Sequence, residues 1–338
     1  MKKSFLFFLF FLLAVTSDTI GQTLGGSSVF GFLKVSPSPK LSALGNSNVS
    51  SFSNDLSLSY HNPALLRKEN GKQLVANFTQ FYADIKAVQA STATYYAPWE
   101  TTFSASVVYF NYGKSTLTDV SGNTYGNFSA NDYLAQVSAS KQYLEHWFYG
   151  TTVKFIHSSY AQYRSSAIAA DFGLNYFDSS RQLQIGFVAK NMGIQLKSYA
   201  GIPEDLPFDI QIGITKRLIG SPLQFSLTAQ RLHQYNLTYN DTTFNNANGI
   251  RKSSNDLASN LFRHLIFATE ILVSDKLQFS VGFNVLRRSE LLIANSANGL
   301  TGFSFGASYS IKKMHINFAR SSYQQSNGIN QFGLSVQL

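Results

Sequence analysis

Two Ser-x-x-Lys strings are the residues of this sequence that come nearest to a catalytic motif: Ser138 with Lys141, and Ser310 with Lys313. In serine acyl-enzymes the serine opens a helix, and the lysine lies one turn away on the same face. Here both strings fall at the ends of expected strands, where residues three apart point to opposite faces. No Lys-Thr-Gly accompanies them, so we do not expect acyl transfer.

The remaining residues with catalytic or metal-binding chemistry form no pattern either. The six histidines show no His-x-x-x-His or similar ligand spacing, and the chain has no cysteine. There is no Gly-x-Ser-x-Gly, no phosphate-binding loop and no acidic metal-binding loop. We therefore expect a protein that is not an enzyme and has no cofactor.

Four charged residues stand on the polar faces of expected strands. Lys154 and Asp171 belong to one neighbouring pair of strands, and Lys190 and Asp209 to another. Opposite charges that face each other inside a barrel often pair. One interpretation is a selective pore, and the other is a set of structural ion pairs that fill the lumen. We favour structural ion pairs over a selective pore.

The composition favours strands with two unlike faces. The chain has 338 residues, of which 13% are charged and 14% aromatic, and its mean hydropathy is −0.06. The charged share is about half of that in a typical globular protein. Few charges, many aromatics and neutral hydropathy occur together when each strand carries one apolar face and one uncharged polar face.

The N-terminus predicts export. Lys2 and Lys3 precede the apolar run from Phe5 to Val15, and small residues follow up to Gly21. Residues 1–21 are thus a predicted signal peptide. The alternative, a transmembrane anchor, needs roughly 20 apolar residues. An exported chain with a net charge of +9 meets anionic lipid head groups and not nucleic acid.

Two-residue periodicity divides the rest of the chain into strands. In the segment 222–233, apolar Leu223, Phe225 and Leu227 alternate with polar Gln224 and Ser226. Soluble sandwiches usually place Lys and Glu on the outward face, so we infer that these apolar faces meet lipid and the polar faces a lumen. The expected strands are 72–82, 86–97, 102–112, 132–141, 146–157, 166–178, 182–191, 207–217, 222–233, 261–273, 276–288, 299–311, 313–321 and 328–338.

The connections between these strands alternate in length. Links after even-numbered strands are very short, whereas most links after odd-numbered strands are long, including Gly113–Asn131, Met192–Leu206, Gln234–Asn260 and Ser289–Asn298. This alternation is typical of an up-and-down barrel with tight turns on one side of an outer membrane. The sequence therefore predicts an all-β fold, a 14-stranded antiparallel transmembrane β-barrel over residues 72–338. Tyr and Trp near the strand ends fit interfacial girdles, or an ordinary strand preference for aromatics.

The segment 22–71 is too irregular for a membrane strand. It holds two close prolines, then weak alternation, then the turn-rich sequence HNPALL. We expect it either to fold into the lumen as a plug or to lie on the periplasmic rim.

This segment also carries a resemblance to a known family. The stretch Leu41 to Leu66 has an Ala-Leu-Gly element, then an acidic residue, then Asn-Pro-Ala. The residues that match are Ala43, Leu44, Gly45, Asp55, Asn62, Pro63 and Ala64. It resembles the entry segment of the FadL-like barrels of Bacteroidetes, and within them the PorQ-like proteins of the type IX secretion system. Asn46 departs from the pattern, because a second glycine is expected there and its absence should loosen the turn.

The resemblance implies a non-enzymatic outer-membrane anchor. PorQ-like proteins are linked to an attachment complex with PorU-, PorV- and PorZ-like partners, which joins secreted cargo to lipopolysaccharide. This chain would hold a PorZ-like protein at the cell surface. The alternative is a FadL-like channel for uptake of hydrophobic small molecules, which requires an apolar pocket in the lumen. The inner faces read mostly as Gln, Ser and Thr, which weakens that alternative.

The largest loop, Gln234–Asn260, is the expected docking surface, with the long side toward the cell surface. It has few apolar residues for a core of its own, so it should become ordered on binding. Its aromatic and basic residues are the candidates for partner contact. They are Tyr235, Tyr239, Phe244, Arg251 and Lys252. The alternative is that the loop only shields the lumen.

Overall fold

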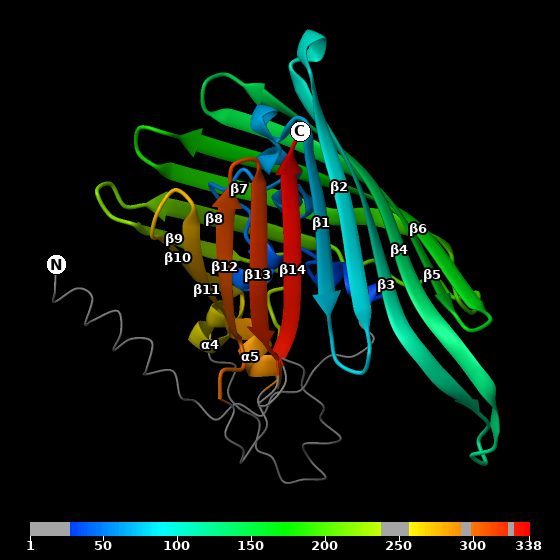
Figure 1. The fold of residues 1–338 in the computed structure, drawn as a ribbon. Coiled ribbons are helices and arrows are strands. Elements are labelled where there is room, and N and C mark those ends of the chain that lie inside the picture. The colour runs from blue at the N-terminus through cyan, green and yellow to red at the C-terminus, as the bar shows by residue number, and fades with distance from the viewer. Residues whose placement is uncertain (1–27, 238–256, 292–298, 324–327) are drawn as a thin grey trace.

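The computed structural model describes residues 28–237, 257–291, 299–323 and 328–338, and within these ranges fourteen strands form one closed antiparallel barrel. The strands follow chain order around the ring, and β1 closes it against β14 (Figure 1). This confirms the predicted fold class. The strands are β1 (Gln73–Gln80), β2 (Lys86–Tyr96), β3 (Thr101–Thr118), β4 (Thr124–Tyr143), β5 (Trp147–Tyr160), β6 (Tyr163–Asp178), β7 (Leu183–Lys197), β8 (Asp209–Arg217), β9 (Leu223–Ala229), β10 (Leu265–Leu272), β11 (Leu277–Asn284), β12 (Phe303–Ile311), β13 (Met314–Ser322) and β14 (Gly328–Gln337).

The two-residue periodicity of the sequence gives the barrel wall one buried inner face and one exposed outer face. Along β1, buried and exposed residues alternate without a break, so Val75 points into the lumen and Leu74 points out. Across the closing seam Leu74 pairs with Val336, which is also an outward residue. The outer face is consequently an apolar surface, and each strand pairs with a neighbouring strand on both sides in the closed ring. A closed ring of this kind meets the requirement that hydrocarbon places on a polypeptide backbone.

The two ends of the barrel differ. The short turns and the C-terminus lie at one end, here called the turn end, and the helices α4 (Leu257–Arg263) and α5 (Val285–Leu291) lie at the other, the loop end (Figure 1). The turn between β2 and β3 is the 3-10 helix η5 (Ala97–Trp99). Both tryptophans, Trp99 and Trp147, are exposed at the turn end, as expected for a girdle at a membrane interface.

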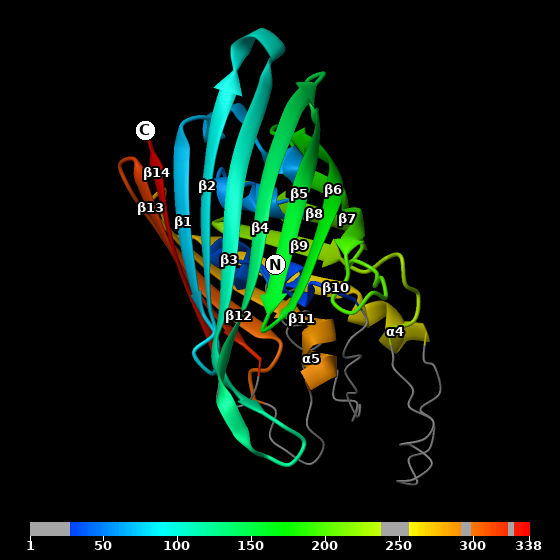
Figure 2. The same ribbon diagram turned by 90° about the vertical axis from the view of Figure 1, so that its right-hand side faces the viewer.

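Several predicted connections and strand ends are wrong, including the link Met192–Leu206, where β7 continues to Lys197. The stretch Gly113–Asn131 is not a loop, because β3 and β4 continue to pair from Lys114–Ser129 to Thr118–Thr124. The resulting hairpin extends past its neighbours at the loop end (Figure 2). The link between β5 and β6 spans only residues 161–162, and α5 replaces the expected end of strand 276–288.

The N-terminal segment Ser28–Gly71, here called the plug, lies inside the barrel (Figures 1 and 2). It consists of short helices joined by turns: η1 (Gly31–Lys34), α2 (Pro39–Ala43), η2 (Leu56–Tyr60), η3 (Pro63–Leu65) and η4 (Lys68–Asn70). Helix α2 packs against β11–β14, and η3 packs against β4–β6. No helix in the described ranges is long and apolar enough to span a membrane.

Side-chain caps explain why the plug forms such short elements. Ser38 caps α2 by accepting from the Leu41 amide at 3.4 Å, and Pro39 follows at the first helical position. Asp55 caps η2 by accepting from the Ser57 amide at 2.9 Å. The other carboxylate oxygen of Asp55 accepts from Asn317 Nδ2 of β13 at 2.9 Å. The Asp55 side chain therefore both caps the start of η2 and holds the plug against the wall.

Candidate functional site

The plug approaches the wall most closely where the wall has glycine. Inward-facing glycines stand on seven strands and meet the plug: Gly150, Gly173, Gly186, Gly213, Gly282, Gly306 and Gly333. A Cβ at Gly282 would collide with Leu44 and Gly45, and one at Gly306 with Ala43. On the other side of the lumen, Gly150 and Gly173 face Pro63 and Asn62. The Ala-Leu-Gly and Asn-Pro-Ala elements are thus among the parts of the plug that contact the wall.

The turn after Gly45 is closed by Asn46 and not loosened by it. Asn46 has φ 83°, a left-handed conformation that asparagine tolerates better than most residues. Its side-chain oxygen accepts from the Ser36 amide at 3.0 Å, and its Nδ2 donates to the Lys34 carbonyl at 2.9 Å. The expected effect of the missing glycine was wrong, because the asparagine side chain ties the turn to the segment before α2.

The glycine contacts lead to a first prediction. Gly186→Ala would place a Cβ inside the contact radius of the Val49 carbonyl oxygen in the plug. Because this neighbour is backbone and cannot rotate away, we expect a loss of roughly 1–3 kcal/mol in unfolding free energy. The matched control is Gly31→Ala, whose Cβ would meet no atom within 4 Å. Denaturant midpoints in detergent micelles measure both, and equal midpoints would refute the close approach.

A buried ion pair joins helix α2 of the plug to strand β10 of the wall. Lys40 of α2 contacts the carboxylate of Glu270 on β10, and the two side chains are only 2% and 3% exposed. Lys40 Nζ also lies 3.3 Å from Gln278 Oε1, and Gln224 Nε2 donates to the second oxygen of Glu270. The sequence analysis missed this pair. The sequence feature that indicates this pair is Glu270, an acidic residue within the mostly apolar strand LIFATEIL.

A second buried network lies between the plug and strands β5–β7. Lys154 Nζ is 2.6 Å from Asp171 Oδ2 and 2.8 Å from Asn191 Oδ1. Asn191 is an extra residue in β7: it opposes no residue of β6, has φ 57°, and donates its amide to Asp171 at 2.7 Å. A bulge of this kind turns two successive side chains, Lys190 and Asn191, into the lumen.

The expected Lys190–Asp209 ion pair does not form. The two residues face each other across β7 and β8, yet Lys190 Nζ lies 3.2 Å from His61 Nδ1 of the plug instead. Asp209 accepts from the Arg231 amide at 2.6 Å and from Gln211 Nε2 at 2.6 Å. Lys190 therefore contacts His61 of the plug, a partner that the strand pattern alone does not predict.

The contact with Lys190 requires a neutral histidine. His61 is fully enclosed, and burial, followed by the charges of Lys190 and Lys154, holds its pKa well below the usual range. Nδ1 therefore carries a lone pair that accepts from the lysine. This arrangement joins the plug to the wall without a carboxylate.

The inner wall is not uniformly polar. Inward residues of β2–β6 near the loop end form an apolar cluster with η1 of the plug, here called the lumen cluster. It comprises Val29, Phe30, Phe32, Leu33, Tyr60, Ala87, Val108, Phe110, Leu134, Ile156, Ala167, Ala169 and Leu206. The expectation of polar inner faces holds for most inward positions of these strands and was wrong at their loop end. The signal in the sequence was the loss of alternation, as in Val107–Val108 and Phe155–Ile156, where both faces are apolar.

The wall beside the lumen cluster is incomplete between β7 and β8. Their pairing ends at Lys190–Asp209, while β7 continues to Lys197 with only β6 as its neighbour. Ile194 and Leu196 in this extension are exposed. The connection 198–208 crosses the gap and places Leu206 in the lumen cluster. Its Asp205 carbonyl accepts from the Val29 amide at 3.0 Å, which ties this connection to the plug.

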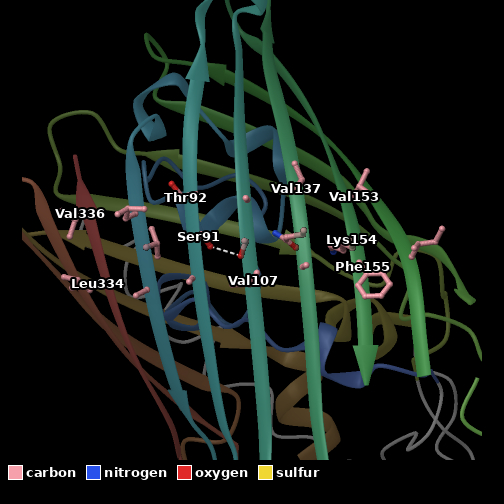
Figure 3. A pocket seen from close by; sticks show the side chains of 18 residues that line it. Ser91, Thr92, Val107, Val137, Val153, Lys154, Phe155, Leu334 and Val336 are labelled. Carbon is pink, nitrogen blue, oxygen red and sulfur yellow. Dashed lines mark hydrogen bonds between the residues drawn. The ribbon is translucent and has the colours of Figure 1, made fainter. Parts of the chain in front are cut away.

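A hollow of about 880 Å³ lies on the outside of the barrel. It is lined mainly by outward residues of β1–β6 and β14, including Val107, Val153 and Phe155 (Figure 3). Alanines on four neighbouring strands make the wall thin there: Ala76, Ala90, Ala105 and Ala135. This hollow faces away from the plug, so it is a feature of the apolar outer surface.

The other residues singled out in the sequence form no common site. Tyr235 is exposed at the loop end, and Tyr239, Phe244, Arg251 and Lys252 lie outside the described residues, as does the predicted signal peptide. Ser138 bonds Thr152 at 2.7 Å, and Ser310 bonds His315 at 2.7 Å. Within the described ranges, no group of three His, Asp or Glu residues is placed to hold a metal.

Comparison with known proteins identifies the fold. No protein-family model and no curated protein matches the chain. Among solved structures, CymD, described as a monoaromatic hydrocarbon channel, is 12% identical with a TM-score of 0.53, covering 91% of this chain and 97% of CymD. A TodX deltaS2S3 mutant, described likewise, is 11% identical with a TM-score of 0.52, covering 88% and 97%. This is the FadL-like barrel fold. At 11% and 12% identity, the similarity of this chain to these two structures concerns the fold alone.

Proposed function

We propose that this chain is a gated conduit for small hydrophobic molecules in the outer membrane of a Gram-negative bacterium. The observation that carries the proposal is the lumen cluster, an apolar patch where inward residues of five strands meet the η1 region of the plug. Binding sites for small apolar molecules are lined predominantly by apolar side chains, as this patch is. The fold shared with two monoaromatic hydrocarbon channels supports this reading over that of a passive anchor. In this arrangement the loop end faces the cell surface.

The plug acts as the gate. Phe32 and Leu33 of η1 and the preceding Phe30 cover the apolar wall, so an apolar solute that enters from the loop end competes with them for the same surface. Because η1 is tied to the 198–208 connection at Asp205, displacing it also pulls on the segment that crosses the β7–β8 gap. That gap opens toward the outer apolar surface, which gives a solute an exit into lipid.

A change of polarity at constant volume tests the proposal. Val108 is 2% exposed and lies in the lumen cluster. Val108→Thr keeps the shape of the site and adds a hydroxyl, which costs about 1 kcal/mol when an apolar partner is bound, or about fivefold in affinity. We expect uptake of radiolabelled toluene by cells carrying this variant to fall about fivefold. The control is Val120→Thr at the fully exposed hairpin tip. Unchanged uptake in the Val108 variant would exclude the cluster as the route.

A second candidate function is the surface anchor of a type IX secretion attachment complex. The projecting β3–β4 hairpin supports it, because its tip is hydrogen-bonded within itself and presents an exposed Val120. Asp119 accepts from the Ser121 and Asn123 amides, both at 2.9 Å, and hydrogen bonds from Asn123 hold its pKa below the usual value. A PorZ-like partner, with PorU- and PorV-like proteins, would then act at the cell surface near lipopolysaccharide. In the same cells, replacing residues 114–129 by a tight turn separates the two functions: lost cargo attachment supports the anchor, and full attachment refutes it.

A further inference from the structure

An unpaired guanidinium lies at the mouth of the barrel. Arg287 belongs to the first turn of α5, where its amide donates to Asn284 Oδ1 at 3.0 Å. Its side chain turns inward and is 6% exposed. Nη2 donates to the Gly302 carbonyl at 2.8 Å and to Ser304 Oγ at 2.6 Å. These contacts fix the plane of the guanidinium.

The rest of this guanidinium has no partner. Nε and Nη1 of Arg287 are both buried without a hydrogen-bond acceptor. Among the described residues, no carboxylate lies within 4.0 Å of it. Glu290, one helical turn farther along α5, pairs with Arg231 at 3.5 Å instead. A buried charge with free donors is unfavourable unless an anion completes it.

The groups around Arg287 are aromatic and basic. Its guanidinium carbon lies 4.9 Å from the centre of the Tyr323 ring. Tyr82, from the turn between β1 and β2, lies within electrostatic reach of Tyr323, Arg287 and Arg320. Burial, followed by Tyr323, raises the pKa of Tyr82 to about 12, while the two arginines oppose the rise. Tyr82 and Tyr323 are half-buried, so the cluster borders on solvent at the loop end.

We propose that Arg287 is the centre of an oxyanion-binding site at the loop-end mouth. Its free N–H groups would donate to the oxygens of a phosphate group, held as a charge-assisted contact. The phosphate belongs either to a free ion or to a lipid head group at the membrane surface. This site is separate from the lumen cluster and does not depend on the proposed conduit.

The test is phosphate-dependent stabilisation of the full chain in detergent micelles. The melting temperature is followed against inorganic phosphate, with sodium chloride at matched ionic strength as the baseline. A second arm adds phosphatidic acid to the micelles in place of the free ion. We expect one of the two arms to raise the melting temperature by about 2–4 °C.

Two variants decide whether Arg287 is responsible. Arg287→Gln should lose the shift, and Arg288→Gln should keep it, because Arg288 Nη1 already donates to the Thr301 carbonyl at 3.0 Å. The readout is the difference with and without phosphate, so a lower starting stability does not obscure it. If the Gln variant fails to fold, Arg287→Lys should fold with a reduced shift. No shift in either arm, or an undiminished shift in Arg287→Gln or Arg287→Lys, overturns the proposal.

Discussion

Lys40→Met is expected to lower the stability of the plugged barrel by about 3–5 kcal/mol, because it leaves Glu270 charged and buried without its cation. The remaining contact of Glu270, from Gln224, is a neutral amide and does not balance the charge. Denaturant unfolding in micelles measures the loss. Protease cleavage within the plug should begin at lower denaturant than cleavage of the barrel, since the ion pair joins these two parts.

The double variant Lys40→Met with Glu270→Met is the control for that prediction. Replacing both members of a buried ion pair by apolar residues of similar volume is often close to neutral. Most of the lost stability should therefore return. A double variant as unstable as the single one would mean that Lys40 matters for packing alone and that the charge pair does not hold the plug.

The second large effect concerns the outer face. Val107 is outward and 56% exposed near the middle of β3, between the inward residues Ser106 and Val108. Val107→Arg should cost about 2–4 kcal/mol if this position faces the centre of a bilayer. The same substitution at Val120, at the tip of the hairpin outside the barrel, should change stability by less than about 0.5 kcal/mol.

Refolding into vesicles at a series of urea concentrations measures both arginine variants. Equal stability of the Val107 and Val120 variants would show that the apolar face does not meet lipid. A loss at Val120 alone would place the hairpin, and not the barrel wall, in the membrane.

Gln224 shows why a lumen position is not a neutral control for such tests. From the sequence alone, Gln224 faces a lumen, and an arginine there should be mild beside Phe225→Arg. In the structure Gln224 is 4% exposed and donates to Glu270. The plug fills the lumen at that level, so the polar face of the strand is as closely packed as a protein core.

The strands were predictable because a barrel repeats one local rule. Most strands, such as Gln73–Gln80 and Gly328–Gln337, alternate between lipid and lumen, and the alternation identifies them without knowledge of their neighbours. The ends of strands were less predictable. Thr124–Ser129 pairs beyond the barrel wall, where neither face meets lipid and the alternation of apolar residues is lost.

The site was less predictable, because it depends on contacts between the plug and distant strands. Lys190 was assigned to Asp209 on the adjacent strand, but His61 lies 129 residues earlier in the chain. The lumen cluster likewise joins η1 to five strands. Its inward members, such as Leu134 and Ile156, are ordinary apolar residues whose face is known only after the register is fixed.

Locating a bound apolar molecule tests the central claim most directly. Crystals of the full chain soaked with bromobenzene would show the bromine by its anomalous scattering. The account predicts a peak inside the barrel among Phe32, Phe110 and Leu134, with η1 displaced from the wall. Bromine found only in the outer hollow beside Val107 and Phe155, or nowhere on the protein, would contradict it.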